Sequence, residues 1–121
     1  MNGLWIFIGG GIGSLTRYGI GMMVSSVNHF SFPLGTLISN IFSCVLLALL
    51  IVGFSHKFET VNWIQPFLII GFCGGLSTFS TFSAETVALI QSGNYWVAIL
   101  NILISLFAGI GSVLIILNSS K

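Results

Sequence analysis

The chain consists of four long apolar runs that are separated by short polar stretches. The runs extend over residues 4–24, 34–54, 64–89 and 96–117, and the connections fall at 25–33, 55–62 and 91–95. A helix needs roughly 20 residues to cross about 30 Å of hydrocarbon, so each run is long enough to span a membrane. Pro33 and the Gly93-Asn94 pair fall in connections, where helix ends are expected. The pattern predicts an all-α membrane protein in which residues 1–121 form a single domain of four transmembrane helices.

The third run contains the most polar stretch of the chain. Residues 71–85 hold three glycines, five hydroxyl side chains and one carboxylate. Gly74-Gly75 and Ser77-Thr78 are poor helix formers, because glycine carries a high backbone entropy cost and hydroxyls offer competing hydrogen bonds. Broken backbone at membrane depth is tolerated only where it is buried in protein or lines a cavity. We therefore expect a break in this helix with an ion site beside it, where carbonyl oxygens suit a cation such as sodium and amide hydrogens suit an anion.

Two aromatic side chains, Phe79 and Phe82, follow the expected break at a spacing that puts both on one helix face. Packing in the core or against lipid is the simplest interpretation. Because an aromatic ring carries positive partial charge at its edge, ring edges turned into a pore could instead hold a small anion. Glu85 follows on the same side of the helix, and it either lies near the membrane interface or acts as a gate or proton carrier.

Polar side chains also form stripes on the second and fourth helices. The second helix carries Thr36, Asn40 and Ser43 on one face, and the fourth carries Asn101, Ser105, Gly109 and Ser112. Taken singly, each stripe is explained by hydrogen bonds between helices, which contribute roughly 0.6–2 kcal/mol. Together with the polar stretch of the third helix, these stripes place polar side chains on three helices. That is more than helix packing needs, and it indicates a polar path through the membrane.

The first helix carries one cation, Arg17, on the same face as Gly9, Gly13 and Gly21. Glycines at four-residue steps let helices approach closely. An arginine at membrane depth costs a few kcal/mol unless it is paired or reaches water. Arg17 therefore either snorkels to the nearer interface or anchors a vestibule that attracts anions.

Composition excludes most soluble functions. The chain is 55% hydrophobic and 4% charged, whereas a soluble domain carries about 25% charged residues. Its near-neutral charge argues against nucleic-acid binding, which needs a basic face. No nucleophile–base pair or metal-ligand cluster is visible in the sequence, so an enzyme is not expected.

Three motifs resemble the signatures of the small bacterial fluoride channels, the Fluc or CrcB family. They are the stretch GFCGGLSTFSTF at 71–82, the glycine cluster 9–13 leading to Arg17-Tyr18, and the stretch PLGTL at 33–37 leading to Asn40. Their order and spacing match, and the resemblance covers essentially the whole chain. It implies a multi-pass protein of the bacterial plasma membrane that exports fluoride passively and protects the cell from it.

The resemblance also implies a dual-topology dimer, in which two chains insert antiparallel and form two narrow fluoride pores. The residues that it places at the pore are Phe79, Phe82, Asn40, Ser80, Thr81, Ser105 and Ser112. It implies a structural sodium ion at the dimer centre, held by the backbone carbonyls of Gly74 and Ser77.

Two positions depart from the family pattern. Ser77 stands where threonine is common, which leaves a backbone carbonyl ligand intact, and Ser43 stands where glycine is common, which affects how closely the second helix packs. Some members are heterodimers of paralogous subunits, each with one fixed orientation. Lys57 and Lys121 fall on one side of the membrane here, but a bias of two charges orients a chain only weakly. Homodimer and heterodimer both remain open.

The main alternative is a subunit of a small multidrug-resistance-type antiporter, which also has four helices. Such a protein exchanges protons against a cationic drug at a membrane-embedded carboxylate. The first helix contains Arg17 and no acidic residue, which favours the fluoride channel.

Overall fold

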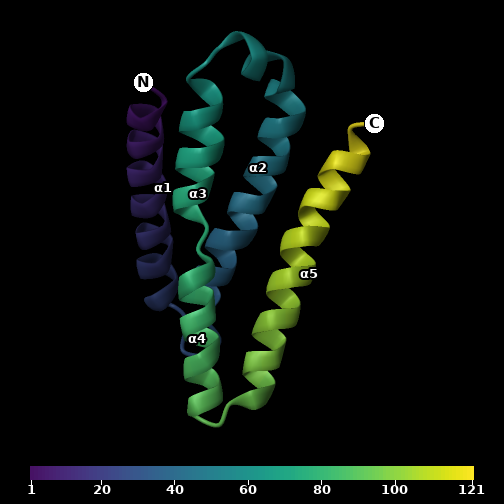
Figure 1. Cartoon of the computed structure of the whole chain (residues 1–121). Coiled ribbons are helices and arrows are strands. Elements are labelled where there is room, and N and C mark those ends of the chain that lie inside the picture. The colour runs from purple at the N-terminus through teal and green to yellow at the C-terminus, as the bar shows by residue number, and fades with distance from the viewer.

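The computed structural model describes all residues from Met1 to Lys121, and the prediction of an all-α chain is confirmed. The helices are α1 (Asn2–Ser25), α2 (Leu34–Thr60), η1 (Gln65–Cys73), α3 (Gly74–Leu76), α4 (Phe79–Gln91) and α5 (Tyr95–Ser119). They form an elongated bundle in which η1, α3 and α4 follow one another along a common line (Figure 1). Both termini lie at the same end as the connection from α2 to η1, so the chain traverses the bundle four times.

Three helical segments are long and apolar enough to cross a membrane. They are α2, the interrupted segment Gln65–Gln91 and α5. The remaining long helix, α1, has 24 residues but is not among them, since it is glycine-rich and carries Arg17. The fold is therefore three membrane-length segments with a more polar fourth helix packed against them.

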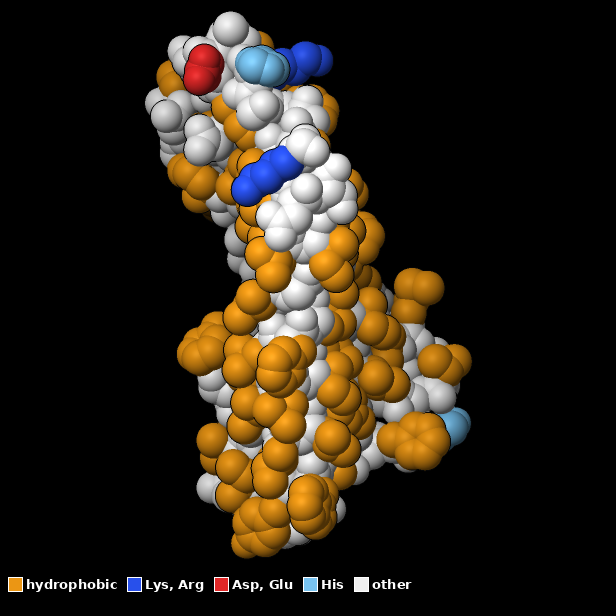
Figure 2. Space-filling view, turned by 90° about the vertical axis from the view of Figure 1, so that its right-hand side faces the viewer, with side chains coloured by type: hydrophobic (Ala, Val, Ile, Leu, Met, Phe, Trp, Pro, Cys, Tyr) orange, Lys and Arg blue, Asp and Glu red, His pale blue; other side chains and the backbone are white.

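Helix α2 continues through Thr60, beyond residue 54, where the apolar run ends. Its last turns contain no proline, and Lys57 near the carboxyl end suits the partial negative charge of the helix terminus. The connection to η1 is accordingly short. His56, Lys57 and Glu59 in the last turns of α2 are exposed. The Lys, Arg, Asp and Glu side chains that are visible in Figure 2 lie in the upper part of that view.

Close contact between α1 and the η1–α3 segment depends on glycine. A Cβ atom at Gly9 would meet the backbone of Phe67 and Phe72, and one at Gly13 would meet the backbone of Phe72 and Leu76. The predicted close approach is therefore confirmed for these two glycines. Gly21, on the same face, lies against a different helix, since a Cβ at Gly35 of α2 would come within 3.2 Å of its Cα.

The segment η1 is a π-helix of nine residues, and no feature of the sequence predicted it. Its backbone is hydrogen-bonded from i to i+5, which makes the helix wider than an α-helix. Pro66 lies in its first turn, where a backbone N–H has no partner within the helix, so the proline is accommodated without loss of a hydrogen bond. This wide π-helix contacts α1 at Gly9 and Gly13, which have no side chains.

The outer surface of the bundle is largely apolar. Only 17 of the 121 residues are buried, and large hydrophobic side chains such as Phe7, Leu15 and Phe107 are more than 70% exposed. Hydrophobic side chains spread over the lower two thirds of the face seen in Figure 2. A soluble monomer rarely exposes contiguous apolar patches larger than a few hundred Å². This surface suits lipid or a second chain.

Candidate functional site

The break in the third membrane segment lies at Ser77 and Thr78. Both residues have extended backbone, with φ −84° and ψ 156° at Ser77 and φ −152° and ψ 116° at Thr78. A break was predicted from Gly74-Gly75 together with Ser77-Thr78, and it falls at the second pair, whereas Gly74 and Gly75 are helical and form part of α3. Gly75 is needed for packing instead, since a Cβ there would meet the backbone of Gly10 in α1.

Asn40 of α2 holds the break with two hydrogen bonds to one residue. Its Oδ1 accepts a hydrogen bond from the Thr78 amide at 2.7 Å, and its Nδ2 donates to the Thr78 carbonyl at 3.2 Å. The side chain thus replaces the helical partners that the extended backbone has lost. Unpaired backbone groups at membrane depth cost several kcal/mol each, so this polar contact is what permits the break.

Three further side chains donate to the carbonyl oxygens of Cys73, at the end of η1, and Gly75, in α3. Arg17 of α1 donates from Nε to the Gly75 carbonyl at 3.1 Å, and Ser43 of α2 donates to the Cys73 carbonyl at 2.8 Å. Ser77 donates from its own hydroxyl to the same Cys73 oxygen at 3.0 Å. Arg17 therefore reaches inward to the backbone beside the break.

A groove of about 230 Å³ runs beside the break between α2, α4 and α5. Its lining residues are Asn40, Cys44, Ser77, Thr78, Phe79, Phe82, Ser105, Leu106 and Gly109. The rings of Phe79 and Phe82 lie 6.0 Å apart at an interplanar angle of 39°, and Phe79 is 79% exposed. One groove thus brings together an amide, a hydroxyl and two aromatic rings that are distant in the sequence.

The other residues predicted at the pore lie outside this groove within one chain. Ser80 and Thr81 both hydrogen-bond to the Thr78 hydroxyl, at 3.3 Å and 3.1 Å, in the first turn of α4. Ser112 donates to the carbonyl of Gly109 in its own helix. The structure therefore joins Ser80 and Thr81 to the break through Thr78, and leaves Ser112 one turn beyond the groove.

A second depression, of about 210 Å³, lies on the other side of Ser77. It is lined by Ser43, Cys44, Leu47, Ile69, Cys73, Gly74 and Ser77. The Thr78 amide, which an unbroken α-helix would direct to the Gly74 carbonyl, donates to Asn40 instead. The Gly74 carbonyl has therefore lost the N–H donor that a regular helix would supply. A carbonyl oxygen that is to bind a cation needs such a vacant position.

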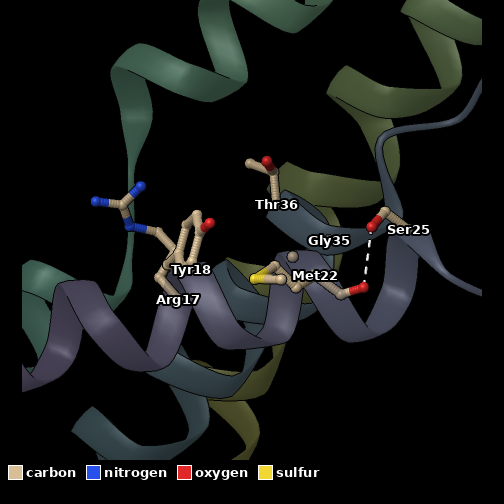
Figure 3. Close-up of a pocket in the computed structure, with 7 residues that line it drawn as sticks. Arg17, Tyr18, Met22, Ser25, Gly35 and Thr36 are labelled. Atoms are coloured by element: carbon tan, nitrogen blue, oxygen red, sulfur yellow. Dashed lines mark hydrogen bonds between the residues drawn. The ribbon is translucent and has the colours of Figure 1, made fainter.

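A further cavity lies between α1 and the beginning of α2. This cavity of about 280 Å³ is lined by Arg17, Tyr18, Gly21, Met22, Ser25, Gly35 and Thr36 (Figure 3). In Figure 3 the guanidinium of Arg17 points away from Thr36, toward the extended backbone between α3 and α4. Arg17 thus lines this cavity while its Nε donates to the Gly75 carbonyl.

Glu85 lies inside the bundle, paired with a residue of α2. The Thr36 hydroxyl donates to Glu85 Oε1 at 2.7 Å, while Oε2 is buried without a hydrogen-bond partner. The matching polar positions on two helices were visible in the sequence, but their pairing was not. Thr86, the next residue, was missed altogether, although it lies one turn after Phe82 and contacts α5 through Asn101.

Fold and site together define a class of protein. It is a small helical membrane protein in which a broken helix, held by polar side chains from two neighbouring helices, lies beside a groove lined by amide, hydroxyl and aromatic side chains. Such an arrangement is typical of ion-conducting membrane proteins, which use irregular backbone only where it is shielded from lipid.

Comparison with known proteins identifies the family. Residues 4–117 match the family described as CrcB-like protein, Camphor Resistance (CrcB), so this chain belongs to that family. A protein of Azobacteroides pseudotrichonymphae named fluoride-specific ion channel FluC is 42% identical over 112 residues, which cover 89% of this chain and 86% of the relative.

Two further relatives carry the same name. The one from Coxiella burnetii is 42% identical over 106 residues, covering 87% of this chain and 86% of the relative. The one from Solibacter usitatus is 34% identical over 113 residues, covering 93% of each. The family that the sequence motifs suggested is confirmed.

Proposed function

We propose that this chain is the subunit of a fluoride-selective channel that lets fluoride leave the bacterial cell passively across the plasma membrane. The observation that carries the proposal is the groove beside the helix break, where the Asn40 amide, the Ser105 hydroxyl and the rings of Phe79 and Phe82 meet. Relatives named for fluoride conduction, which align with nearly the whole chain, support the choice of ion. A channel forms and breaks no covalent bond, so no enzymatic activity is proposed.

Fluoride is small and strongly hydrated, so the groove must replace its water with other donors. Asn40 has two hydrogens on Nδ2, and only one is directed to the Thr78 carbonyl. The second hydrogen is available to an anion in the groove. The edges of Phe79 and Phe82 add weak positive partial charge, which binds an anion loosely enough to let it leave. Ser80 and Thr81 extend the row of hydroxyls from the break.

The assembly is proposed to be an antiparallel dimer in which α1 serves as the fourth spanning helix. Two features of the chain support an antiparallel dimer. It exposes a large apolar surface, and it has few charged residues that would orient it in the membrane. Two copies related by a twofold axis in the membrane plane would each contribute one groove. A paralogous chain of opposite orientation would serve equally well as the partner.

A sodium ion is proposed at the dimer centre, bound by the carbonyls of Gly74 and Ser77. Both residues line the same open depression, and the Gly74 carbonyl lacks the donor that a regular helix would supply. Sodium prefers oxygen ligands of this kind. We expect the midpoint of thermal unfolding in detergent to rise with sodium concentration and not with choline; equal midpoints in the two salts would remove the ion from the account.

The alternative of a proton-coupled drug antiporter has one supporting observation, the buried carboxylate of Glu85. That carboxylate already accepts a hydrogen bond from Thr36 and does not line the groove. A growth test separates the two functions. Expression of the chain in bacteria that lack a fluoride exporter should restore growth in fluoride and give no protection against a quaternary ammonium drug. Protection against the drug alone would reverse the assignment.

A further inference from the structure

Asn101 is the most deeply buried polar side chain between α4 and α5, with 1% of its surface exposed. Its Nδ2 donates to the Thr86 hydroxyl at 2.9 Å, and its Oδ1 accepts a hydrogen bond from the Ser105 hydroxyl at 3.4 Å. Thr86 in turn donates to the carbonyl of Phe82 at 2.8 Å. A continuous chain of hydrogen bonds therefore joins two residues that line the groove, Ser105 and Phe82, through two that do not.

The direction of this chain follows from the hydrogens available. A threonine hydroxyl has one hydrogen, and that of Thr86 is directed to the Phe82 carbonyl. Toward Asn101 the Thr86 oxygen can therefore only accept, so the amide nitrogen of Asn101 must face it. The Asn101 carbonyl oxygen is then left facing Ser105, whose single hydrogen must be donated to it.

Ser105 consequently presents lone pairs, and no hydrogen, to the groove. An anion needs a donor, so it can use the Ser105 hydroxyl only by taking its hydrogen away from Asn101. The bond that would break is 3.4 Å long and therefore weak, whereas the bonds at Thr86 are short. Transfer of the Ser105 hydrogen bond from Asn101 to an anion therefore costs little free energy. The other hydrogen bonds, between Asn101, Thr86 and Phe82, stay in place.

We infer that Asn101 is a positioning residue that competes with the conducted anion for the hydroxyl hydrogen of Ser105, and so limits how tightly the groove holds the anion. The inference rests on the proposed function, because it assumes that fluoride passes this groove. A pore must release its ion as readily as it binds it, and a donor that is available only by exchange meets that need.

Replacement of Asn101 with leucine tests the competition, since leucine has a similar size and no hydrogen-bonding group. The Ser105 hydrogen is then free to point into the groove, and we expect the fluoride concentration that gives half-maximal efflux from liposomes to fall about three- to tenfold, the usual range for one net hydrogen bond. This decrease in the half-maximal fluoride concentration should depend on the Ser105 hydroxyl. The double variant Asn101→Leu/Ser105→Ala should therefore have the same half-maximal concentration as Ser105→Ala alone.

A purely structural role for Asn101 predicts a different pattern. Loss of packing would reduce maximal flux or thermal stability whether residue 105 is serine or alanine. It would not decrease the fluoride concentration that gives half-maximal efflux. That pattern, or a decrease that persists without the Ser105 hydroxyl, overturns the inference. A wild-type chain that carries no fluoride would contradict the proposed function itself, so the two failures can be told apart.

Thr86→Val provides a second route if the leucine variant does not fold. Valine keeps the branched shape but removes the acceptor that orients the Asn101 amide, so the amide can turn and the Ser105 hydrogen is again released. We expect the same decrease in half-maximal concentration, abolished by Ser105→Ala. An unchanged value in Thr86→Val overturns the inference.

Discussion

Single side chains determine whether the broken helix can exist in lipid. Asn40 satisfies both backbone groups of Thr78, and Arg17 and Ser43 satisfy carbonyls on the preceding turn. Each of these residues comes from a helix other than the broken one. The residues that stabilise the break are thus also the residues that tie α1 and α2 to it.

The first prediction at this scale concerns the aromatic edges. Phe82→Ile keeps an apolar side chain in the groove but removes the ring, and we expect fluoride efflux to fall by at least about tenfold while the protein stays folded. Phe7→Ile is the matched control, because Phe7 is 78% exposed on α1 and lines none of the described cavities. Efflux that survives in Phe82→Ile at the control's rate would refute the role of the ring edge.

The second prediction concerns Asn40. Asn40→Asp keeps the acceptor for the Thr78 amide but replaces the donor to the Thr78 carbonyl with an oxygen, and it places negative charge beside the groove. We expect both fluoride efflux and thermal stability to fall, with efflux reduced at least about tenfold by repulsion of the anion. Asn62→Asp, at an exposed site in the connection before η1, should change neither. Wild-type efflux in Asn40→Asp would remove Asn40 from the pore.

Sequence reasoning located most of these residues, because an asparagine or arginine within an apolar run stands out. It could not assign their partners. Asn101 was recognised as part of a polar stripe, yet its partner Thr86 was not, since a hydroxyl in a helix commonly bonds to its own backbone. Which side chains meet depends on how the helices rotate against one another, and a single sequence does not contain that information.

At the scale of the elements, the α1 interface is made by backbone contact. The π-helical turns of η1 and Gly75 of α3 pack directly on the glycines of α1. The sequence predicted the helices by the lengths of their apolar runs, and predicted a break by its polar residues. The expected break included Gly74-Gly75 as well as Ser77-Thr78, and only the second pair has extended backbone. A glycine pair that weakens an isolated helix can equally permit close packing of a buried one.

Two neighbouring glycines of α1 give a matched test of this interface. Gly9→Ala places a methyl group against the backbone of Phe67, and we expect it to destabilise the fold by about 1–3 kcal/mol. Gly11→Ala meets no atom within 4 Å, and alanine should stabilise the helix there by about 0.5–1 kcal/mol. Equilibrium unfolding in detergent measures both. Equal effects of the two variants would contradict the packing described for η1 and α1.

At the scale of the whole molecule, charge and topology are linked. Lys57 and Lys121 lie at the end that holds both termini, and the opposite connections hold no lysine or arginine. Such a small bias suits insertion in either direction. The proposed antiparallel dimer requires both directions to occur in the same membrane.

Labelling of one exposed position measures the orientation. His56→Cys introduces a thiol on the polar end of α2, in a chain whose native Cys44 and Cys73 are replaced by alanine. In sealed vesicles we expect a membrane-impermeant maleimide to label about half of the chains, and the rest only after the vesicles are opened. Complete labelling, or none, in sealed vesicles would show one fixed orientation and therefore a requirement for a paralogous partner.

The central claim is that this chain conducts fluoride, and efflux from liposomes that contain the purified chain tests it most directly. The vesicles are loaded with fluoride or with chloride, and release is followed with an ion-selective electrode. The account predicts rapid release of fluoride with chloride retained. Release of both ions alike, or no fluoride release from folded protein, would contradict it.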